Sequence, residues 1–443
     1  ITPHHGIHHD RYLTFAYDDG GWNNVRMGVE CIIVAAHAMG RTLVVPPQQV
    51  LYLIAATHKD KDDKKAHNVM GFTDFFDLNL LRSHKGFHLM EMPDFLAKEG
   101  VTGGLNGMLP PQNSTQVTGY KLWKYLDKAS DSSPAWQGKF LAFPAKPDDF
   151  EKDLHTITSG RNKARLKEFA DGRQPVYYDK KLQRQHHIHV PGDSEHRILQ
   201  HHYSFLFFAD PEMQSYYRRF IRDYMRYKDE IQCAGSEIIQ RVRAESVRLG
   251  NGGTYYAMHV RRGDFQFKEV KISASEIVKN LDGPEPIIPK GALVYLSTDD
   301  PKGICENCVA KRKPCESFPK GEKPVGCQDD PSWKAFDDYG WHVRFLNDFL
   351  TEEEKRLHTG KINPNHYGMI ESIVCSRAAR FVGTFYSTFT GYIHRLRGFH
   401  GLGEESFYHH KKHLNDLRKK QSMGHGFPRE WRTGWTDDAG GPI

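Results

Sequence analysis

Several patterns that would assign this 443-residue chain to a familiar class are missing from its sequence. No apolar run approaches the ~18 residues that a membrane-spanning helix needs. The phosphate-binding pattern GxxxxGK[ST], the dinucleotide pattern GxGxxG and the nucleophile pattern GxSxG are also missing. These absences count against an NTPase, a dehydrogenase and a serine hydrolase.

Charge of one sign is in only modest excess. The formal net charge is +6 and the isoelectric point is near 8.7. No basic stripe is interleaved with aromatic residues as in single-strand binders, so we expect no nucleic acid partner. A small basic excess favours phosphate-bearing ligands instead. The chain begins at Ile1 rather than Met, and we interpret it as a processed fragment that has lost a signal or membrane anchor.

Cysteine is scarce except in one segment. Four of the seven cysteines follow the spacing C-x2-C-x6-C-x11-C within an insert at 302–330: Cys305, Cys308, Cys315 and Cys327. Disulfide staples and a structural zinc site are both open interpretations, and the Lys-, Pro- and Gly-rich flanks favour disulfides. Cys31 and Cys375 lie in apolar helical patterns and are expected to be buried thiols. Asn113 begins an N-glycosylation triplet.

The first part of the chain has the pattern of a βαβ unit. A strand over Tyr12–Tyr17 is followed by a glycine break. Apolar residues then recur at helical spacing up to Gly40, and a second strand covers Thr42–Val45. This order predicts a parallel sheet. A long helical stretch is expected over 210–249, whereas 104–135 and the tail beyond about 403 are expected to be irregular.

A second α/β pattern follows residue 250. Strands are expected at Thr254–Val260, Leu293–Ser297, Trp341–Phe345 and Arg380–Gly383, with helices over Asn365–Ala379 and around Tyr392–Leu396. We therefore predict an α/β protein with two Rossmann-like domains, 1–245 and 246–443, facing across a ligand cleft.

Three segments carry candidate chemistry at strand ends, where α/β folds bind ligands. Residues 20–26 (GGWNNVR) form a glycine turn that opens a helix, so its free N–H groups suit a phosphate. A plain turn explains the two glycines equally well.

The second segment is 259–265 (HVRRGDF). His259 and Arg261 share one strand face, and a cation at a strand end calls for an anion such as a diphosphate. An ion pair between Arg261 and Asp264 is the structural alternative.

The third segment is 381–389 (FVGTFYSTF). A strand leads into a helix whose first turn holds Ser387 and Thr388, and their hydroxyls with the helix N-terminus would make a second phosphate site. Simple N-capping is the alternative. Asp299 follows the strand Leu293–Ser297 and would bind a base or ribose, although a plain turn at the strand end explains it equally well. The D-x-D pattern at 60–62 lies in a Lys/Asp-rich loop, so we expect no metal site there.

These segments, in this order, resemble those of the protein O-fucosyltransferase superfamily over about residues 12–400. The resemblance rests on the glycine turn 20–26, the HxR strand end at 259–261 and the STF at 387–389. It implies a GT-B fold, a GDP-fucose donor, a secretory compartment (endoplasmic reticulum or Golgi lumen) and an inverting, metal-independent transfer to a Ser or Thr hydroxyl of a protein.

The resemblance also implies roles for individual residues. Arg261 would bind the donor diphosphate and assist the leaving group, while His259 and Asp299 would lie near the guanosine. The implied donor-binding set also contains Gly21, Asn23, Asp264, Ser387, Thr388 and Phe389. A fixed cation that meets charge developing on phosphate oxygens stabilises the transition state.

This sequence departs from the family pattern at the expected base. One branch of the family has an acidic residue directly before the Gly-aromatic-Asn, and here that position is Gly20. Asp18 and Asp19 lie just upstream, and Asp19 is our candidate. The segment RRGD at 261–264 is closer to the thrombospondin-repeat type than to the epidermal-growth-factor type.

Other functions remain open from the sequence. The nearest alternative is a transferase of the same fold that uses another donor, such as UDP-rhamnose, or a glycan acceptor. An inactive glycan-binding homologue and an interaction protein built on the Cys-rich insert are further alternatives.

Overall fold

The computed structural model describes residues 8–18, 20–51, 69–103, 105–111, 120–132, 134–144, 157–262, 265–299, 333–356, 362–418, 430 and 432–436. The chain divides into two compact units, essentially Ile1–Lys228 (unit 1) and Asp229–Gln421 with Pro428–Pro442 (unit 2). The expected boundary at 245/246 falls inside helix α10 (Asp229–Arg248), and the units divide at the beginning of this helix instead.

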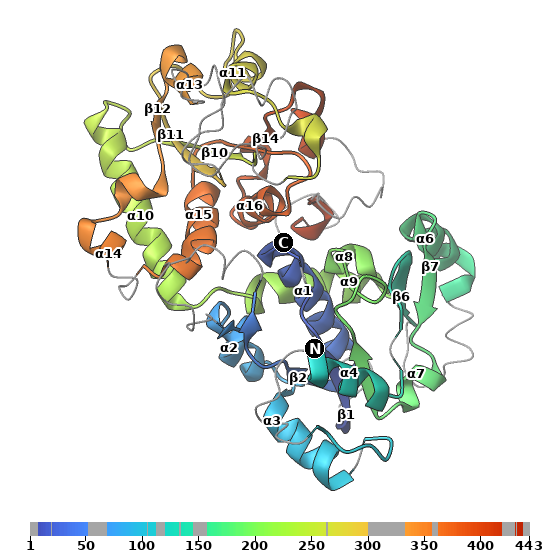
Figure 1. The fold of residues 1–443 in the computed structure, drawn as a ribbon. Helices are drawn as coiled ribbons and strands as arrows, with labels where there is room; N and C mark the ends of the chain where they lie inside the picture. The colour runs from blue at the N-terminus through green and yellow to red at the C-terminus, as the bar shows by residue number, and fades with distance from the viewer. Residues whose placement is uncertain are drawn as a thin grey trace. The chain divides into compact units, whose positions relative to one another are not determined.

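Unit 1 is an α/β body (Figure 1). Its strands are β1 (His8–Phe15), β2 (Arg41–Val45), β3 (Gln49–Val50), β4 (Val69–Met70), β5 (Leu89–Glu91), β6 (Lys139–Phe143), β7 (Gln174–Tyr177), β8 (His187–Val190) and β9 (Leu206–Phe208). Its α-helices are α1 (Trp22–Met39), α2 (Leu78–Ser83), α3 (Met92–Phe95), α4 (Tyr120–Ala129), α6 (Gly160–Ala170), α7 (Lys180–Arg184), α8 (His202–Phe205) and α9 (Pro211–Tyr224), and the π-helix η3 (Leu96–Gly103) follows α3.

The described strands of unit 1 form two parallel sheets and one antiparallel pair. The first sheet has the order β5-β2-β1-β8, the second has the order β7-β6-β9, and β3 pairs with β4. The predicted parallel pairing of the first two strands is confirmed, because β1 pairs with β2 in parallel. β8 lies in parallel on the other side of β1, with Phe15 opposite Val190.

Unit 2 is the second α/β body. Its strands are β10 (Tyr256–Val260), β11 (Leu293–Thr298), β12 (His342–Arg344), β13 (Phe381–Gly383) and β14 (Ser406–Tyr408). Its α-helices are α10, α11 (Ala274–Leu281), α13 (Lys334–Tyr339), α14 (Glu352–Arg356), α15 (Tyr367–Ser376) and α16 (Thr388–Phe399). Within the part of unit 2 that the structure describes, every strand pairing is parallel, in the order β12-β11-β10-β13-β14.

Helix α1 illustrates how the sequence pattern sets the fold. Its apolar residues recur at helical spacing, and nearly every residue from Val25 to Met39 is buried. Gly40 ends the helix with φ 65°, and its N–H caps the carbonyls of Ala36 and His37. Only glycine adopts this left-handed conformation freely, so the predicted stop is confirmed.

Three expectations from the sequence are wrong in detail. The helical stretch expected over 210–249 is two helices, because α9 ends at Tyr224 and the chain forms a bridge between Tyr227 and Phe76 before α10 begins. Helix α4 lies within the stretch 104–135 that was expected to be irregular. Strand β14 lies in the tail beyond 403, where three residues are too few for a recognisable alternation.

The two faces of the unit 2 sheet pack against different helices. Alternate residues Met258 and Val260 of β10 join Val294 and Leu296 of β11 in a core that α11 and α13 cover. On the other face α15 packs against β10 and β11. Residues of β10 with the opposite parity, His259 among them, therefore point to the side of α15 and α16.

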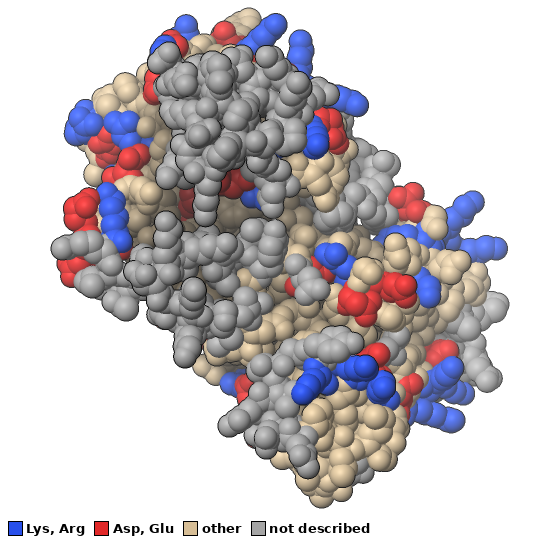
Figure 2. All heavy atoms as spheres, in the orientation of Figure 1, with Lys and Arg blue, Asp and Glu red and all other residues tan. Residues whose placement is uncertain are grey.

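No helix among the described residues is long and apolar enough to cross a membrane. On the face drawn in Figure 2, acidic side chains lie among the Lys and Arg side chains.

Candidate active site

Two of the three predicted segments meet where the order of the unit 2 sheet reverses. Numbered in chain order, the strands read 3-2-1-4-5 across the sheet, so the chain crosses from one side of β10 to the other before β13. Open parallel sheets bind ligands outside the carboxyl ends of the strands at this switch point. Residues 259–262 leave β10 there, and 383–389 connect β13 to α16.

Arg261 is held at the end of β10 by Asp299. Its Nη1 lies 2.9 Å from the Asp299 Oδ2, and Asp299 Oδ1 accepts a hydrogen bond of 2.8 Å from the N–H of Arg262. The side chain of Arg261 is still 23% exposed. An oriented and accessible guanidinium suits bidentate binding of phosphate oxygens. The structure thus joins two predicted site residues, Arg261 and Asp299. The alternative partner considered for Arg261, Asp264, lies outside the described residues.

Arg262 points to the opposite face of the strand, as the alternation predicted. Its side chain is fully buried, and its guanidinium carbon lies 3.9 Å from the ring centroid of Trp333. This cation–π contact places Arg262 against the core that α11 and α13 cover. The two adjacent arginines therefore have different roles, and only Arg261 faces the switch point.

His259 lies beneath Arg261 as a neutral imidazole. Its Nδ1 is 2.7 Å from the hydroxyl of Thr390, and its ring centroid is 4.7 Å from that of Phe389. Burial, followed by repulsion from Arg261, lowers the pKa of His259 to about 3. The ring therefore carries no charge near neutral pH, so Arg261 rather than His259 supplies the cation at this end of β10.

The third segment presents a helix N-terminus to the same place. Ser387 is the N-cap residue of α16, but its side chain makes no capping hydrogen bond, so the alternative of simple N-capping does not describe it. Thr388 is the first helical residue and Phe389 packs on His259. The free N–H groups of this helix start and the Ser387 hydroxyl are suitable donors to an anion.

Gly383 allows β13 and α16 to come close. A Cβ atom at this position would overlap the side chain of Thr390. The glycine in the predicted segment therefore has a packing reason, namely the tight turn from strand to helix.

Glu371 was not singled out from the sequence, and it lies on the same side of the sheet. Loss of hydration raises the pKa of Glu371 to about 8, and the nearby side chains of Ser297 and Tyr295 of β11 act in the opposite direction. Carboxyl groups with a strongly shifted pKa are candidates for ligand contact. A lone acidic residue on the otherwise apolar helix α15 is the signal that would have identified it.

The first predicted segment lies at the equivalent point of unit 1. The order β5-β2-β1-β8 also reverses beside β1, and residues 20–26 follow that strand. Gly21 is the N-cap of α1, and Asn23 lies in the first turn. Arg26 is turned inward instead, with its Nε 2.9 Å from Glu30 and its Nη1 2.7 Å from the hydroxyl of Tyr227.

Asp18 closes this turn through an ion pair with Arg197. Arg197 donates to Asp18 Oδ1 at 2.8 Å and lies 2.5 Å from Oδ2, while the N–H of Gly20 donates to Oδ1 at 2.6 Å. A small, mostly apolar pocket lies beside the pair between β1, α1 and the segment after β8. Both carboxylate oxygens of Asp18 thus have partners.

Five predictions fall on residues outside the described part of the chain. They are the candidate base Asp19, the donor-binding candidate Asp264, the glycosylation triplet at Asn113, the four-cysteine segment 305–327 and the D-x-D pattern at 60–62. Cys31 and Cys375 are free thiols and buried, as predicted. No group of three or more His, Cys, Asp or Glu residues that could hold a metal occurs within the described ranges.

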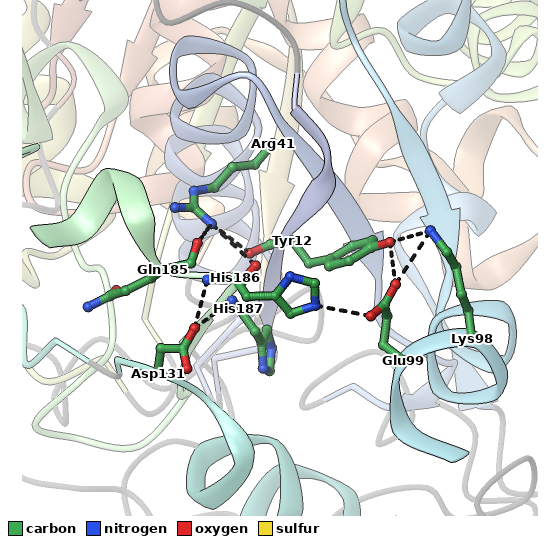
Figure 3. Close-up of polar contacts among 8 residues, drawn as sticks. All are labelled: Tyr12, Arg41, Lys98, Glu99, Asp131, Gln185, His186 and His187. Atoms are coloured by element: carbon green, nitrogen blue, oxygen red, sulfur yellow. Dashed lines mark hydrogen bonds and ion pairs between the residues drawn. The ribbon is translucent and has the colours of Figure 1, made fainter. Parts of the chain in front are cut away.

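A second polar cluster in unit 1 lies at the amino ends of β1 and β8 (Figure 3). The Tyr12 hydroxyl donates to Glu99 and accepts from Lys98, both at 2.6 Å, and His186 lies 3.0 Å from Glu99. Asp131 accepts from the N–H groups of His186 and His187 at the start of β8. Ligands bind parallel sheets at the other edge, so we interpret this cluster as structural.

Comparison with solved structures finds fucosyltransferases. A crystal structure of POFUT1 in complex with GDP-fucose is 14% identical, covering 91% of this chain and 99% of that chain with a TM-score of 0.36. A structure of NodZ alpha-1,6-fucosyltransferase soaked with GDP-fucose is 14% identical, covering 87% and 92% with a TM-score of 0.35. Fucosyltransferase NodZ from Bradyrhizobium is 13% identical, covering 88% and 94% with a TM-score of 0.36.

None of the curated protein sequences matches the chain significantly. The family model for GDP-fucose protein O-fucosyltransferase does match, over residues 12–297. This span contains the glycine turn after β1, the HxR end of β10 and most of β11. The α/β architecture of each unit, with its parallel sheets, agrees with the Rossmann-like domains that the sequence pattern predicted. The chain is a glycosyltransferase that belongs to the GDP-fucose protein O-fucosyltransferase family.

Proposed function

We propose that the protein transfers fucose from GDP-fucose to a Ser or Thr hydroxyl of a protein acceptor, with inversion at the sugar carbon and without a metal ion. The observation that supports this proposal best is the anchored and accessible guanidinium of Arg261. It is anchored by Asp299 at the switch point of the unit 2 sheet, near the start of α16. The family description supports the donor and the acceptor class.

The chemistry follows from where charge develops. As the bond between fucose and GDP breaks, the β-phosphate oxygens gain negative charge. A fixed guanidinium and the helix N–H groups stabilise this charge most strongly in the transition state, so they lower the barrier. In an inverting reaction the acceptor hydroxyl attacks the sugar from the face opposite GDP and transfers its proton to a base.

The base in this proposal is Asp19, the candidate from the sequence. Asp18 is less suited to this role, because its two oxygens already bind Arg197 and the N–H of Gly20. Asn23 in the first turn of α1 would contact the fucose and the acceptor. We also propose that the protein works in the lumen of the endoplasmic reticulum or Golgi, where its acceptors fold.

A transfer assay tests the donor, the acceptor class, the independence from metal and the stereochemistry of the proposal. The protein is incubated in EDTA with labelled GDP-fucose, GDP-mannose, UDP-glucose or UDP-rhamnose and with folded thrombospondin-type or epidermal-growth-factor-type repeats. The proposal predicts label from GDP-fucose alone on a protein repeat, with the opposite anomeric configuration by NMR. Transfer from a UDP-sugar, transfer only to free glycans, activity only after metal is restored, or a retained configuration would each contradict it.

A further inference from the structure

Four buried side chains form a closed hydrogen-bond network directly behind Arg261. His259, Thr384, Thr390 and His409 are between 0% and 4% exposed. They come from the end of β10, the residue after β13, helix α16 and the residue after β14. The network therefore joins the four elements that converge at the switch point of the unit 2 sheet.

The hydroxyl of Thr384 is at the centre of this network. It donates to the carbonyl of His259 at 3.0 Å and accepts from the N–H of Arg261 at 2.9 Å. Its third contact is Nε2 of His409, also at 2.9 Å. A hydroxyl has one proton to donate, and here the His259 carbonyl receives it. His409 must therefore donate through Nε2–H, which fixes its tautomer.

His409 is held rigidly on its own side. Its N–H donates to the carbonyl of Gly383 at 3.0 Å, and its carbonyl accepts from the side chain of Asn280 at 3.1 Å. Burial, followed by repulsion from His259, lowers the pKa of His409 to about 3. The imidazole is therefore neutral near neutral pH, and its donor is always available to Thr384.

We propose that His409 and Thr384 are positioning residues for fucosyl transfer, because together they fix the main chain of Arg261 and so aim its guanidinium at the donor diphosphate. This inference rests on the proposed function of Arg261. Arg261 has a fixed acceptor for its N–H only while Thr384 is itself oriented by its other two partners. Small displacements of a group that stabilises the transition state are costly, and about 1 Å can cost about 10²-fold in rate.

The test compares two replacements of His409. His409→Phe keeps a ring of similar size but removes the donor, and it is expected to lower kcat for transfer from GDP-fucose by about tenfold or more. His409→Gln places an amide N–H where Nε2 was and should restore most of that loss. If the Phe variant does not fold, His409→Asn serves instead, because its shorter amide does not reach Thr384. His410→Phe is the matched control, since His410 accepts from the N–H of Lys412 in an exposed turn and should leave kcat unchanged.

A double-mutant cycle with Arg261→Ala separates positioning from general stability. If His409 acts through Arg261, His409→Phe lowers kcat/KM in the native background and has little further effect in Arg261→Ala. An equal loss in both backgrounds, or no loss in the native background, would overturn the inference while leaving the role of Arg261 intact. If Arg261→Ala alone has no effect on transfer, the proposed function itself fails.

Discussion

The switch points of the two units have the same topology but different chemistry. In both sheets the order reverses beside the first strand, and a glycine near the end of the neighbouring strand allows a close approach. In unit 1 it is Gly192, which follows β8 and lies beside the carbonyl of Tyr17, and in unit 2 it is Gly383, the last residue of β13, which lies beside Thr390. In unit 1 the acid follows the first strand, because Asp18 comes after β1 and pairs with Arg197. In unit 2 the cation follows the first strand, because Arg261 comes after β10 and pairs with Asp299. Topology therefore gives both units a place for a ligand, and our proposal assigns the diphosphate to the unit in which the cation follows the first strand, unit 2.

The largest effect is expected from Arg261→Ala. Removing the anchored cation should lower kcat/KM for transfer from GDP-fucose by about 10²–10³-fold, as expected for losing one preorganised group that stabilises transition-state charge. Steady-state kinetics with an unchanged melting temperature would show that the loss is chemical. Arg262→Ala gives a contrast, because it removes a buried cation–π contact and should lower stability. If Arg261→Ala transfers fucose as fast as the native protein, the assignment of the diphosphate to Arg261 in unit 2 is wrong.

The two glycines allow a matched test of the shared topology. Gly383→Ala and Gly192→Ala should each lower the free energy of unfolding by about 1–3 kcal/mol, because the added Cβ overlaps its neighbour. Gly283→Ala is the control, since nothing lies within 4 Å of a Cβ there. Urea denaturation measures all three variants. If Gly383→Ala and Gly192→Ala have the same free energy of unfolding as the control variant, neither switch point depends on close packing at its glycine.

Asp18→Asn tests whether the Asp18–Arg197 pair of unit 1 contributes to fucose transfer without contributing to the affinity for GDP. The variant loses the charge that binds Arg197, so we expect about a tenfold lower kcat/KM, the usual size of one lost charge-assisted hydrogen bond. Affinity for GDP should stay the same, because in this account unit 2 binds the nucleotide. Asp193→Asn is the control, since Asp193 is exposed and pairs with His196 in the same loop. A weaker affinity for GDP in Asp18→Asn but not in Asp193→Asn would assign the donor to both units.

The smallest effect is expected from Glu371→Gln, as a change in pH dependence. The pKa of Glu371 is raised from 4.5 to about 8, so between these values the unfolded chain has lost a proton that the folded protein keeps. Stability due to this group is therefore complete below about pH 4.5 and falls as pH rises towards 8. The variant should show a flatter decline in unfolding free energy between pH 5 and pH 8. Glu353→Gln, at an exposed position, should keep the native slope.

Sequence reasoning predicted the strands and turns that position the site but not how its side chains pair. The spacing of apolar residues located α1 and β10, because their periodicity reflects burial of a helix and a strand. Strand β14 and His409 were missed, since a short strand has no readable alternation and nothing in the sequence separates His409 from the neighbouring His410. The pairing of Arg261 with Asp299 was missed as well, because the two residues meet only when β10 and β11 pair. Pairing across strands depends on tertiary register, which local sequence does not encode.

The most direct test of the account is calorimetric titration with GDP-fucose in the presence of EDTA, for the native protein, Arg261→Ala and Asp18→Asn. The account predicts binding to the native protein, loss of binding in Arg261→Ala and native affinity in Asp18→Asn. Undiminished binding to Arg261→Ala, or an equal loss in both variants, would contradict the claim that the unit 2 switch point holds the donor.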